Sequence, residues 1–407
     1  MKRLVSICDW LPPDFGAVGQ YAEIEARRVA AEGADVTLVG LSSSADESKD
    51  EKLGKGTLRT VRLLVRPYER ANFRQRALWT AGTNTRLLKA AWRFARAAEE
   101  ILFTGSPPFF LHWIVPANLL LRKRLVYRIT DFHPECLLAE LGQRPLWLQL
   151  FLYWTLFLRR RVHHFEVLGE DQKRRLLEIG IPEDRIYLRR DEAPVEITSH
   201  TEPLELPEPL RDKVVLLYSG NFGVAHDDAT FVEGYARHHR EGSGRVVLWL
   251  NATGAKADRV EAALRERRLP LHRSRPVPLA DLPRLLVTPH AHLITLRDEF
   301  VGYVLPSKVY GCIASGRSVL FVGSADSDVH LLCSERLGGR GGERGAVDAS
   351  PDGSPAAEPQ RARYRRVGVG DAAAVARALD ELVLESLSRA GKALAPEVPA
   401  RDPRALR

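Results

Sequence analysis

The sequence predicts an α/β protein built from two doubly wound, parallel-sheet domains. The chain has 407 residues, which is more than a single hydrophobic core usually serves. Short apolar runs alternate with glycine-containing loops and helical stretches from the N-terminus onward. The same alternation restarts after a charged segment at 191–213 that carries four prolines, which indicates a linker between two similar halves.

The first forty residues predict a βαβ unit. The apolar run LVSIC (4–8) is typical of a buried strand, and a Gly/Pro loop follows it. QYAEIEARRVAAEG (20–33) predicts a helix that ends at Gly33, and DVTLVG (35–40) predicts a second buried strand. Two strands joined through a helix should pair in parallel.

The pattern continues through both halves. In the first half we expect strands at 60–65, 101–105, 125–130, 165–169 and 184–189, with helices at 74–99 and 145–161. In the second half we expect strands at 214–220, 245–251, 292–296 and 318–323, and an amphipathic helix at 371–387.

These elements predict the domain boundaries. We expect an N-terminal domain at 1–190, a linker at 191–213, a C-terminal domain at 214–390 and a tail at 391–407. The stretch 338–366 is rich in Gly, Arg, Ser and Pro, which predicts a disordered insert in the second domain. Two doubly wound domains predict a ligand cleft between them, at the carboxyl ends of the strands.

The composition favours an ordinary globular protein with anionic partners. Apolar residues make up 45% of the chain and charged residues 28%, and the formal net charge is +8. A basic balance suits nucleotide phosphates, nucleic acid or an acidic membrane face. The basic residues form no single long run, so the net charge does not indicate which of these partners is bound. A proteome that is generally rich in arginine would give the same basic balance.

The cysteines and the N-terminus predict a cytoplasmic protein. Cys8, Cys136, Cys312 and Cys333 are scattered and form no metal-binding spacing, so we expect free thiols in a reducing compartment. The N-terminal sequence has no sustained apolar stretch of the kind that a secretory signal needs. No segment reaches the ~20 apolar residues of a membrane-spanning helix.

Two glycine loops are candidate binding elements. Gly16 and Gly19 follow the first strand, where a ligand could approach the backbone, although a tight turn alone would also need them. The dinucleotide fingerprint is not met and the second strand ends in Gly40 rather than an acidic residue, which disfavours NAD.

The second glycine loop opens the C-terminal half. Gly220 and Gly223 again lie between a strand and a helix, where backbone N–H groups could hold a diphosphate. His226 and Asp227 follow this loop; they either cap the next helix or contact the ligand directly.

The segment 292–323 carries the most specific signal. Asp298, Glu299 and Gly302 occupy a charged loop after a strand, and Ser307 precedes a short helix with Lys308 in its first turn. The N-terminus of a helix does not favour a cation, so an anion bound at this point would explain why Lys308 stands there. The alternatives are that Lys308 is a solvated lysine and that Glu299 is an ordinary surface glutamate.

His133 and Asp131 stand in TDFHPE, directly after a predicted strand. Either side chain could accept a proton or bind an acceptor sugar, and a turn residue before Pro134 is an equal interpretation.

The helix at 144–164 combines apolar and aromatic residues with three consecutive arginines. It is too short to span a bilayer. This pattern is typical either of a wholly buried core helix or of a helix that makes peripheral contact with the inner face of an anionic membrane.

Taken in order, these segments resemble the retaining glycosyltransferases of family 4, which have the GT-B fold of two Rossmann-like domains. The resemblance covers about residues 1–335. The residues that carry it are WLPPDFGAVGQYAEIEARRVAAEGADVTLVG, LGEDQKRRLLEIGIPEDRIYL, LYSGNFG, DLPRLL and DEFVGYVLPSKVYGCIASGRSVLFVG.

The resemblance implies transfer of a sugar from a nucleotide-diphosphate sugar, with retention of anomeric configuration, to a glycan, lipid-linked or small-molecule acceptor. It implies no cofactor, no metal and no nucleic-acid partner. Glu299, Lys308, His133 and Asp131 would be the catalytic candidates, and Gly16 and Gly19 would lie on the acceptor side. The donor-binding residues would be Gly220, Asn221, Phe222, Gly223, Val277, Leu282, Gly302, Ser307, Lys308 and Tyr310.

Two positions depart from the family pattern. Gly311 stands where the family commonly has a second Glu, and Asn221 stands where Arg is common. These departures suggest either a divergent subgroup or, as the alternative function, a non-catalytic or accessory GT-B-like subunit. A Rossmann-type epimerase or dehydrogenase is disfavoured because neither its fingerprint nor its Tyr-x-x-x-Lys motif is present.

Overall fold

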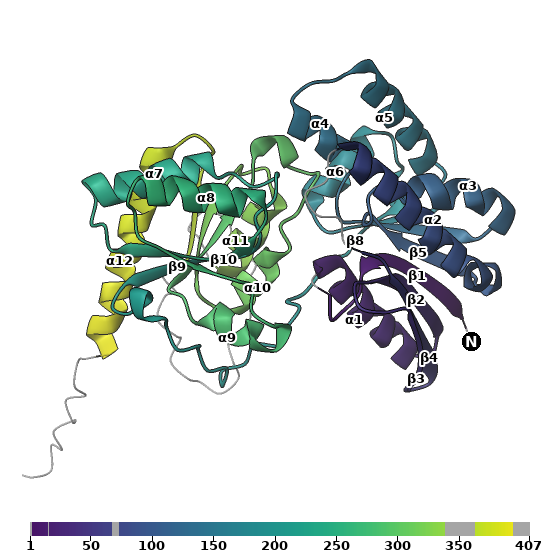
Figure 1. Ribbon diagram of the computed structural model, residues 1–407, viewed down its shortest axis with the longest axis horizontal. Helices are drawn as coiled ribbons and strands as arrows, with labels where there is room; N and C mark the ends of the chain where they lie inside the picture. The colour runs from purple at the N-terminus through teal and green to yellow at the C-terminus, as the bar shows by residue number, and fades with distance from the viewer. Residues whose placement is uncertain (1, 15, 67–72, 338–362, 394–407) are drawn as a thin grey trace, which may run out of the picture. The chain divides into compact units, whose positions relative to one another are not determined.

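The structure, a computed structural model, describes residues 2–14, 16–66, 73–337 and 363–393. It confirms the predicted α/β class, with one mixed, mostly parallel sheet and one all-parallel sheet (Figure 1). The chain divides into two compact units. Unit 1 contains Met1–Glu196, Leu296–Ala314 and Ser324–Cys333, and unit 2 contains Ile197–Thr295, Ser315–Gly323 and Ser334–Arg407.

Unit 1 is built on an eight-stranded sheet of order β3-β4-β2-β1-β5-β6-β7-β8. Its strands are β1 (Arg3–Trp10), β2 (Asp35–Ser42), β3 (Glu47–Leu53), β4 (Gly56–Leu64), β5 (Glu100–Thr104), β6 (Arg124–Ile129), β7 (His164–Val167) and β8 (Ile186–Leu188). All neighbours pair in parallel except β3 and β4, which form an antiparallel hairpin at the sheet edge.

Helices cover both faces of this sheet, as parallel strands require. The helices are α1 (Ala17–Ala31), α2 (Phe73–Ala97), α3 (Leu111–Leu121), α4 (Glu135–Leu141), α5 (Leu146–Arg159) and α6 (Glu170–Glu178). Ala22, Ala26 and Ala30 of α1 pack in one core cluster with Cys8. Val5 and Ile7 belong to a second cluster, which includes α2 and α3 residues.

Unit 2 is built on a six-stranded, all-parallel sheet of order β11-β10-β9-β12-β13-β14. Its strands are β9 (Val214–Asn221), β10 (Val246–Thr253), β11 (Leu271–Ser274), β12 (Ala291–Thr295), β13 (Ser318–Val322) and β14 (Tyr364–Val367). Its helices are α7 (Ala229–Glu241), α8 (Ala255–Glu266), α9 (Leu282–Val287) and α12 (Ala372–Ala393). Helix α10 (Lys308–Ala314) belongs to unit 1, and α11 (Asp328–Leu337) begins in unit 1 and ends in unit 2.

Several elements differ from the sequence prediction in existence or in extent. Strand β3 was not predicted because its side chains are mostly charged and exposed, as is common at a protected sheet edge. The short strand β11 was also missed. The prediction that the disordered insert extends to 366 is wrong, because Tyr364–Val367 pairs with β13 and buries Tyr364 and Val367. Residues 338–362 lie outside the described residues, and α12 continues to Ala393, into the predicted tail.

The α5 helix is not wholly buried, so that alternative from the sequence is wrong. Leu148, Thr155, Leu158 and Arg159 are buried, whereas large apolar residues of the opposite face are exposed. The helix is therefore amphipathic and lies at the surface of unit 1.

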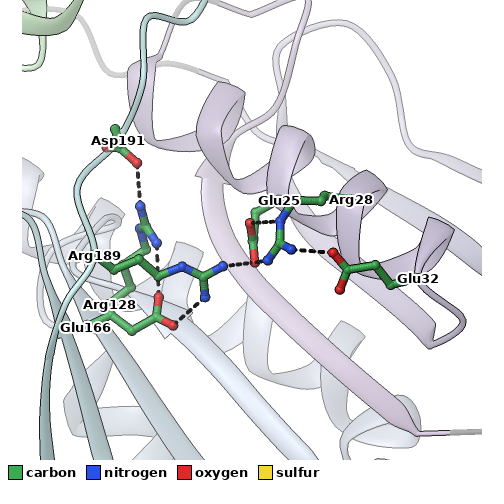
Figure 2. A network of polar contacts seen from close by, with 7 residues as sticks. All are labelled: Glu25, Arg28, Glu32, Arg128, Glu166, Arg189 and Asp191. Carbon is green, nitrogen blue, oxygen red and sulfur yellow. Dashed lines mark hydrogen bonds and ion pairs between the residues drawn. The ribbon is translucent and has the colours of Figure 1, made fainter. Parts of the chain in front are cut away.

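A chain of ion pairs joins the far end of the unit 1 sheet to α1 (Figure 2). Arg128 of β6 binds Glu166 of β7 at 3.0 Å and also pairs with Asp191. Arg189 binds the same Glu166 at 2.8 Å and pairs with Glu25 of α1. The charged groups of this network share partners and are partly shielded from solvent. Together they hold the segment after β8 in place.

The first turn of α1 touches the backbone at the end of β1. A Cβ atom at Gly19 would lie 1.8 Å from the carbonyl oxygen of Trp10 and 2.7 Å from its carbonyl carbon. Gly16, which precedes α1 with an extended φ of −174°, has room for an ordinary contact instead. Gly19 thus has a packing requirement of its own, and the acceptor-side role of both glycines stays a prediction.

Substitution Gly19→Ala is expected to lower the free energy of unfolding by about 3 kcal/mol or more, because α1 must move away from β1. Gly82→Ala in α2 is the matched control: its Cβ meets nothing within 4 Å, so helix propensity should stabilise the protein by up to about 1 kcal/mol. Urea denaturation measures both. Equal stability of the two variants would contradict the close contact.

Candidate functional site

The carboxyl ends of β9, β10 and β11 form one polar edge of the unit 2 sheet. Asn251, near the end of β10, donates hydrogen bonds to Ser274 Oγ at 2.8 Å and to the carbonyl of Arg275 at 2.5 Å. Ser219 of β9 donates to the Asn251 amide oxygen at 3.3 Å. These bonds fix the chain where it leaves all three strands.

The predicted glycine loop lies at this edge. Gly220 has a φ of +112°, which favours glycine, and Asn221 is the last residue of β9. The Phe222 ring is fully buried and stacks on Tyr218 with ring centroids 4.1 Å apart, and its backbone N–H donates to the Thr253 carbonyl at 2.7 Å. A Cβ at Gly223 would meet Asn221 Nδ2 at 3.3 Å.

A second glycine and a lysine lie beside this loop and were not predicted. Gly254 precedes α8 with a φ of +101°, and its Cβ would meet Asn221 Oδ1 at 2.5 Å. The backbone N–H of Lys256, in the first turn of α8, donates to the Phe222 carbonyl at 3.3 Å. The pattern strand–TGAK–helix at 253–256 repeats the strand–glycine–helix signal that identified the other loops, and could have revealed both residues.

The Lys256 ammonium group lies within reach of the same edge. Its Nζ forms an ion pair with Asp228 at 3.0 Å and donates to the carbonyl of His226. Arg259 of the next helical turn binds the same Asp228 carboxylate at 2.6 Å. A cation in the first turn of a helix, next to a glycine loop, is suited to anion binding because the helix dipole adds to its charge.

A hollow with a volume of about 640 Å³ opens at the ends of β10 and β11. This volume is within the usual size of small-molecule sites. Its lining combines the end of β10 with Arg273 of β11, which pairs with Asp258 and Glu261 of α8, and with Arg275, which follows β11. The lining residues are Ala252, Thr253, Gly254, Asp258, Glu261, Arg273, Ser274, Arg275 and Pro276.

The other predicted residues of unit 2 surround this edge. Val277 follows the hollow directly, and both Val277 and Leu282 pack against a buried cluster that includes Trp249. Asp227 accepts a hydrogen bond from the backbone N–H of Thr230 at 3.1 Å, which agrees with the capping interpretation. His226 is buried, and its Nδ1 lies 2.6 Å from the carbonyl oxygen of Thr295.

The predicted loop 298–302 belongs to unit 1. Glu299 is exposed, with 58% of its side chain accessible, and its carboxylate lies 3.4 Å from Arg297 Nε. Gly302 has a φ of +78° and lies against Arg175 of α6. Phe132 N–H donates to the Tyr303 carbonyl at 3.0 Å, and Asp131 forms a β-bridge with Val304. The structure thus brings the predicted segments around Asp131 and Gly302 together.

Lys308 is the first residue of α10, with Ser307 immediately before it and Tyr310 in its first turn. Burial lowers the pKa of the Lys308 amine to about 7, although Cys312 acts in the opposite direction. Burial also raises the pKa of Tyr310. A lysine with a pKa near neutrality is ready to take up a proton when an anion arrives.

Asp131 has an acidic neighbour that the sequence prediction missed. Asp9, Ser106 and Asp131 follow or end three adjacent strands, β1, β5 and β6. Burial raises the pKa of Asp9 to about 6, opposed by a hydrogen bond from Ser106. Burial and the Asp9 charge raise the pKa of Asp131 to about 6. The position of Asp9, directly after the buried run Val5–Cys8, was the available signal.

His133 lies in the same region as Asp131. Burial lowers its pKa to about 4, so the imidazole is neutral near pH 7. Its ring centroid lies 5.5 Å from that of Phe109, and its carbonyl accepts a hydrogen bond from Arg159 at 3.0 Å. Arg159 is fully buried and binds Glu135 at 2.9 Å, so this ion pair supports the segment after β6.

Residues 2–14, 16–66, 73–337 and 363–393 show neither a metal-binding cluster nor a membrane-spanning helix. No group of three or more His, Cys, Asp or Glu residues in those ranges could hold a metal ion. Within the same ranges, no helix has both the length and the apolar character needed to cross a bilayer.

Solved glycosyltransferase structures share this fold. WaaG, a glycosyltransferase involved in lipopolysaccharide biosynthesis, matches with a TM-score of 0.57 and 12% identity over 95% of this chain and 92% of its own. The E. coli trehalose-6-phosphate structure bound with UDP-2-fluoro glucose matches with a TM-score of 0.60 and 12% identity over 95% and 92%. Anabaena HepE, in complex with UDP and glucose, matches at 0.58 and 10% over 95% and 91%.

The chain has the GT-B fold. At these identities the likeness concerns the fold alone. No family model matches the sequence. No curated protein matches it either. The assignment to family 4 therefore stays a prediction, as do the domain boundaries and the catalytic and donor-binding roles assigned from the sequence.

Substitution Asp9→Asn is expected to raise the free energy of unfolding by up to about 3 kcal/mol at pH 8, because it removes a buried charge. Because the pKa of Asp9 is raised to about 6, its buried charge destabilises the folded state to the full extent only above that pH. This destabilisation shrinks as the pH falls from 6 toward 4 and disappears below about pH 3.8, the ordinary pKa of an aspartate, where Asp9 is protonated in both the folded and the unfolded state. Urea denaturation at both pH values measures the difference.

Asp326→Asn, at an exposed position, is the matched control and should change the free energy of unfolding by only a few tenths of a kcal/mol. A difference for Asp9→Asn that is the same at both pH values would contradict the raised pKa of Asp9.

Proposed function

We propose that this chain is a glycosyltransferase, which moves a sugar from a nucleotide-diphosphate sugar onto an acceptor and retains the anomeric configuration. One observation carries the proposal. A hollow of about 640 Å³ lies at the carboxyl edge of a parallel sheet, beside a glycine loop and the helix-borne Lys256. Strand ends of this kind are where α/β sheets bind nucleotides, and the GT-B fold supports the choice of donor.

The proposed donor contacts in unit 2 follow from this geometry. Backbone N–H groups of the Gly220–Gly223 loop and of Ala255, at the start of α8, would hold the diphosphate, with Lys256 supplying positive charge. The N–H groups of Phe222 and Lys256 would not take part, because they donate to the carbonyls of Thr253 and Phe222. The nucleoside would occupy the hollow near Pro276 and Val277. Backbone donors at a helix N-terminus need no metal ion, so we propose that donor binding is independent of metal.

The chemistry would be electrostatic. As the glycosidic bond of the donor breaks, negative charge grows on the diphosphate, and fixed N–H groups and ammonium groups stabilise it. From the family resemblance we propose that Lys308 and Ser307 also contact the diphosphate and that Glu299 binds the donor sugar. Asp131 and His133 are proposed for the acceptor side, with a glycan, lipid-linked or small-molecule acceptor in the cytoplasm.

Calorimetric titration with UDP, GDP and ADP sugars tests the donor site. We expect Lys256→Met to weaken the binding of the preferred donor about tenfold or more, whereas Lys213→Met, exposed before β9, should leave it unchanged.

Slow donor hydrolysis should persist in EDTA, and NMR of a transfer product should give the retained anomer. The proposal fails if no nucleotide sugar binds; binding with neither hydrolysis nor transfer would favour the accessory subunit.

The Lys308 proposal predicts a pH dependence. Because the amine has a pKa near 7, a bound diphosphate must recruit a proton above that pH. The affinity for the nucleotide sugar should fall by up to about tenfold per pH unit between pH 7 and 9. Lys308→Arg, which stays charged, should flatten this dependence. An unchanged slope in the variant would assign the titration to another group.

A further inference from the structure

One face of α5 exposes six large apolar side chains to solvent. We define the α5 face as Leu146, Trp147, Leu150, Tyr153, Trp154 and Phe157, whose exposed fractions run from 47% to 70%. Their spacing repeats every three or four residues, so they form a single stripe along the helix.

The opposite side of α5 is anchored in unit 1, which fixes the direction in which the stripe points. Thr155 Oγ1 lies 3.0 Å from the Nε2 atom of His112 in α3. Arg159 is fully buried and bound to Glu135 in α4, and Leu148 and Leu158 are also buried. The helix therefore cannot turn its apolar stripe into the core without breaking these contacts.

The α5 face is large and carries no charge. From Leu146 to Leu158 the helix has no ionisable side chain except Tyr153. With ~200 Å² for each large side chain, about half of it exposed, the stripe presents roughly 600 Å² of apolar surface. Patches of that size mark interaction surfaces rather than scattered surface residues. Three of the six residues are Trp or Tyr, which favour the boundary between water and lipid.

Basic residues stand at both ends of the stripe. Arg144 precedes α5, Arg160 and Arg161 follow it, and all three are exposed. The Arg161 guanidinium lies 3.4 Å from the centroid of the Phe157 ring, so charge and apolar surface are continuous. An apolar stripe with cations at each end complements an anionic lipid surface. A second copy packed antiparallel would instead bring Arg144 against Arg160 and Arg161, which would repel it.

The length of α5 determines how it could meet a bilayer. Fourteen residues extend about 21 Å, short of the ~30 Å hydrocarbon core. The helix cannot cross, but with one face apolar and the other anchored it can lie in the plane of the interface.

We propose that the α5 face docks unit 1 on an anionic lipid bilayer. The apolar stripe lies among the acyl chains at the boundary, the Trp and Tyr rings sit at the headgroup level, and Arg144, Arg160 and Arg161 bind lipid phosphates. This docking does not depend on the proposed sugar transfer, and its test requires no donor.

Flotation of the full chain with lipid vesicles tests the docking. Wild type is expected to bind vesicles that contain about one-third phosphatidylglycerol, to bind pure phosphatidylcholine vesicles at least tenfold more weakly, and to lose binding in high salt. Leu146→Gln with Leu150→Gln should reduce binding at least tenfold. The matched control, Leu78→Gln with Leu384→Gln, changes equally exposed leucines outside the stripe and should bind as wild type.

A labelled variant gives a second readout that does not rely on loss of binding. The four native cysteines are buried, so a dye that reports polarity can be attached selectively to Leu150→Cys. Its emission should shift to the blue on addition of anionic vesicles, and the same dye on Leu384→Cys should not respond. Arg144→Gln with Arg160→Gln and Arg161→Gln should abolish the preference for anionic vesicles.

Three results would overturn the docking. One is wild-type protein that stays unbound to anionic vesicles at low salt. Another is equal binding by the Leu146→Gln, Leu150→Gln variant and wild type. The third is a stable dimer in sedimentation that dissociates with this double substitution, which would assign the α5 face to a second copy.

Discussion

Parallel pairing of the strands is the constraint on which the rest of this structure depends. Because parallel neighbours run in the same direction, their carboxyl ends meet at one edge of the sheet. In unit 2 this pairing brings Asn221, Thr253 and Ser274 from three strands to a common edge. The same pairing requires helices on both faces, and the helix that follows β10 begins at that edge. The glycine loop, Lys256 and the hollow are therefore consequences of the topology.

Close backbone contact explains several glycines better than ligand binding does. At Gly19 the carbonyl of Trp10 occupies the space of a side chain, and at Gly254 Asn221 and the Phe222 carbonyl do so. The absence of a side chain at a glycine also lets a ligand approach the backbone of the same loop closely. Packing and binding thus place the same demand on the sequence at these positions.

Unit 1 holds ionisable groups that burial shifts in opposite directions. The pKa values of Asp9 and Asp131 rise to about 6, and that of His133 falls to about 4. Each shift favours the neutral form, because burial penalises charge. Arg159 and Glu135 remain a buried ion pair in the same region, since each supplies the other with a counter-charge. On the outside of this region the α5 face remains without cover within unit 1.

The sequence by itself determined the alternation of strands and helices, the glycine loops and the identity of α5 as an apolar helix with basic ends, because these depend on local periodicity. The sequence could not predict β3, because the residues of this strand are mostly charged and the strand is stabilised only by pairing with β4. For Lys256 and Asp9 the sequence offers only a position after a strand, and the tertiary structure decided that they lie beside Phe222 and Ser106. Which face of α5 meets solvent was likewise decided by packing, since buried contacts to His112 and Glu135 are distant in sequence.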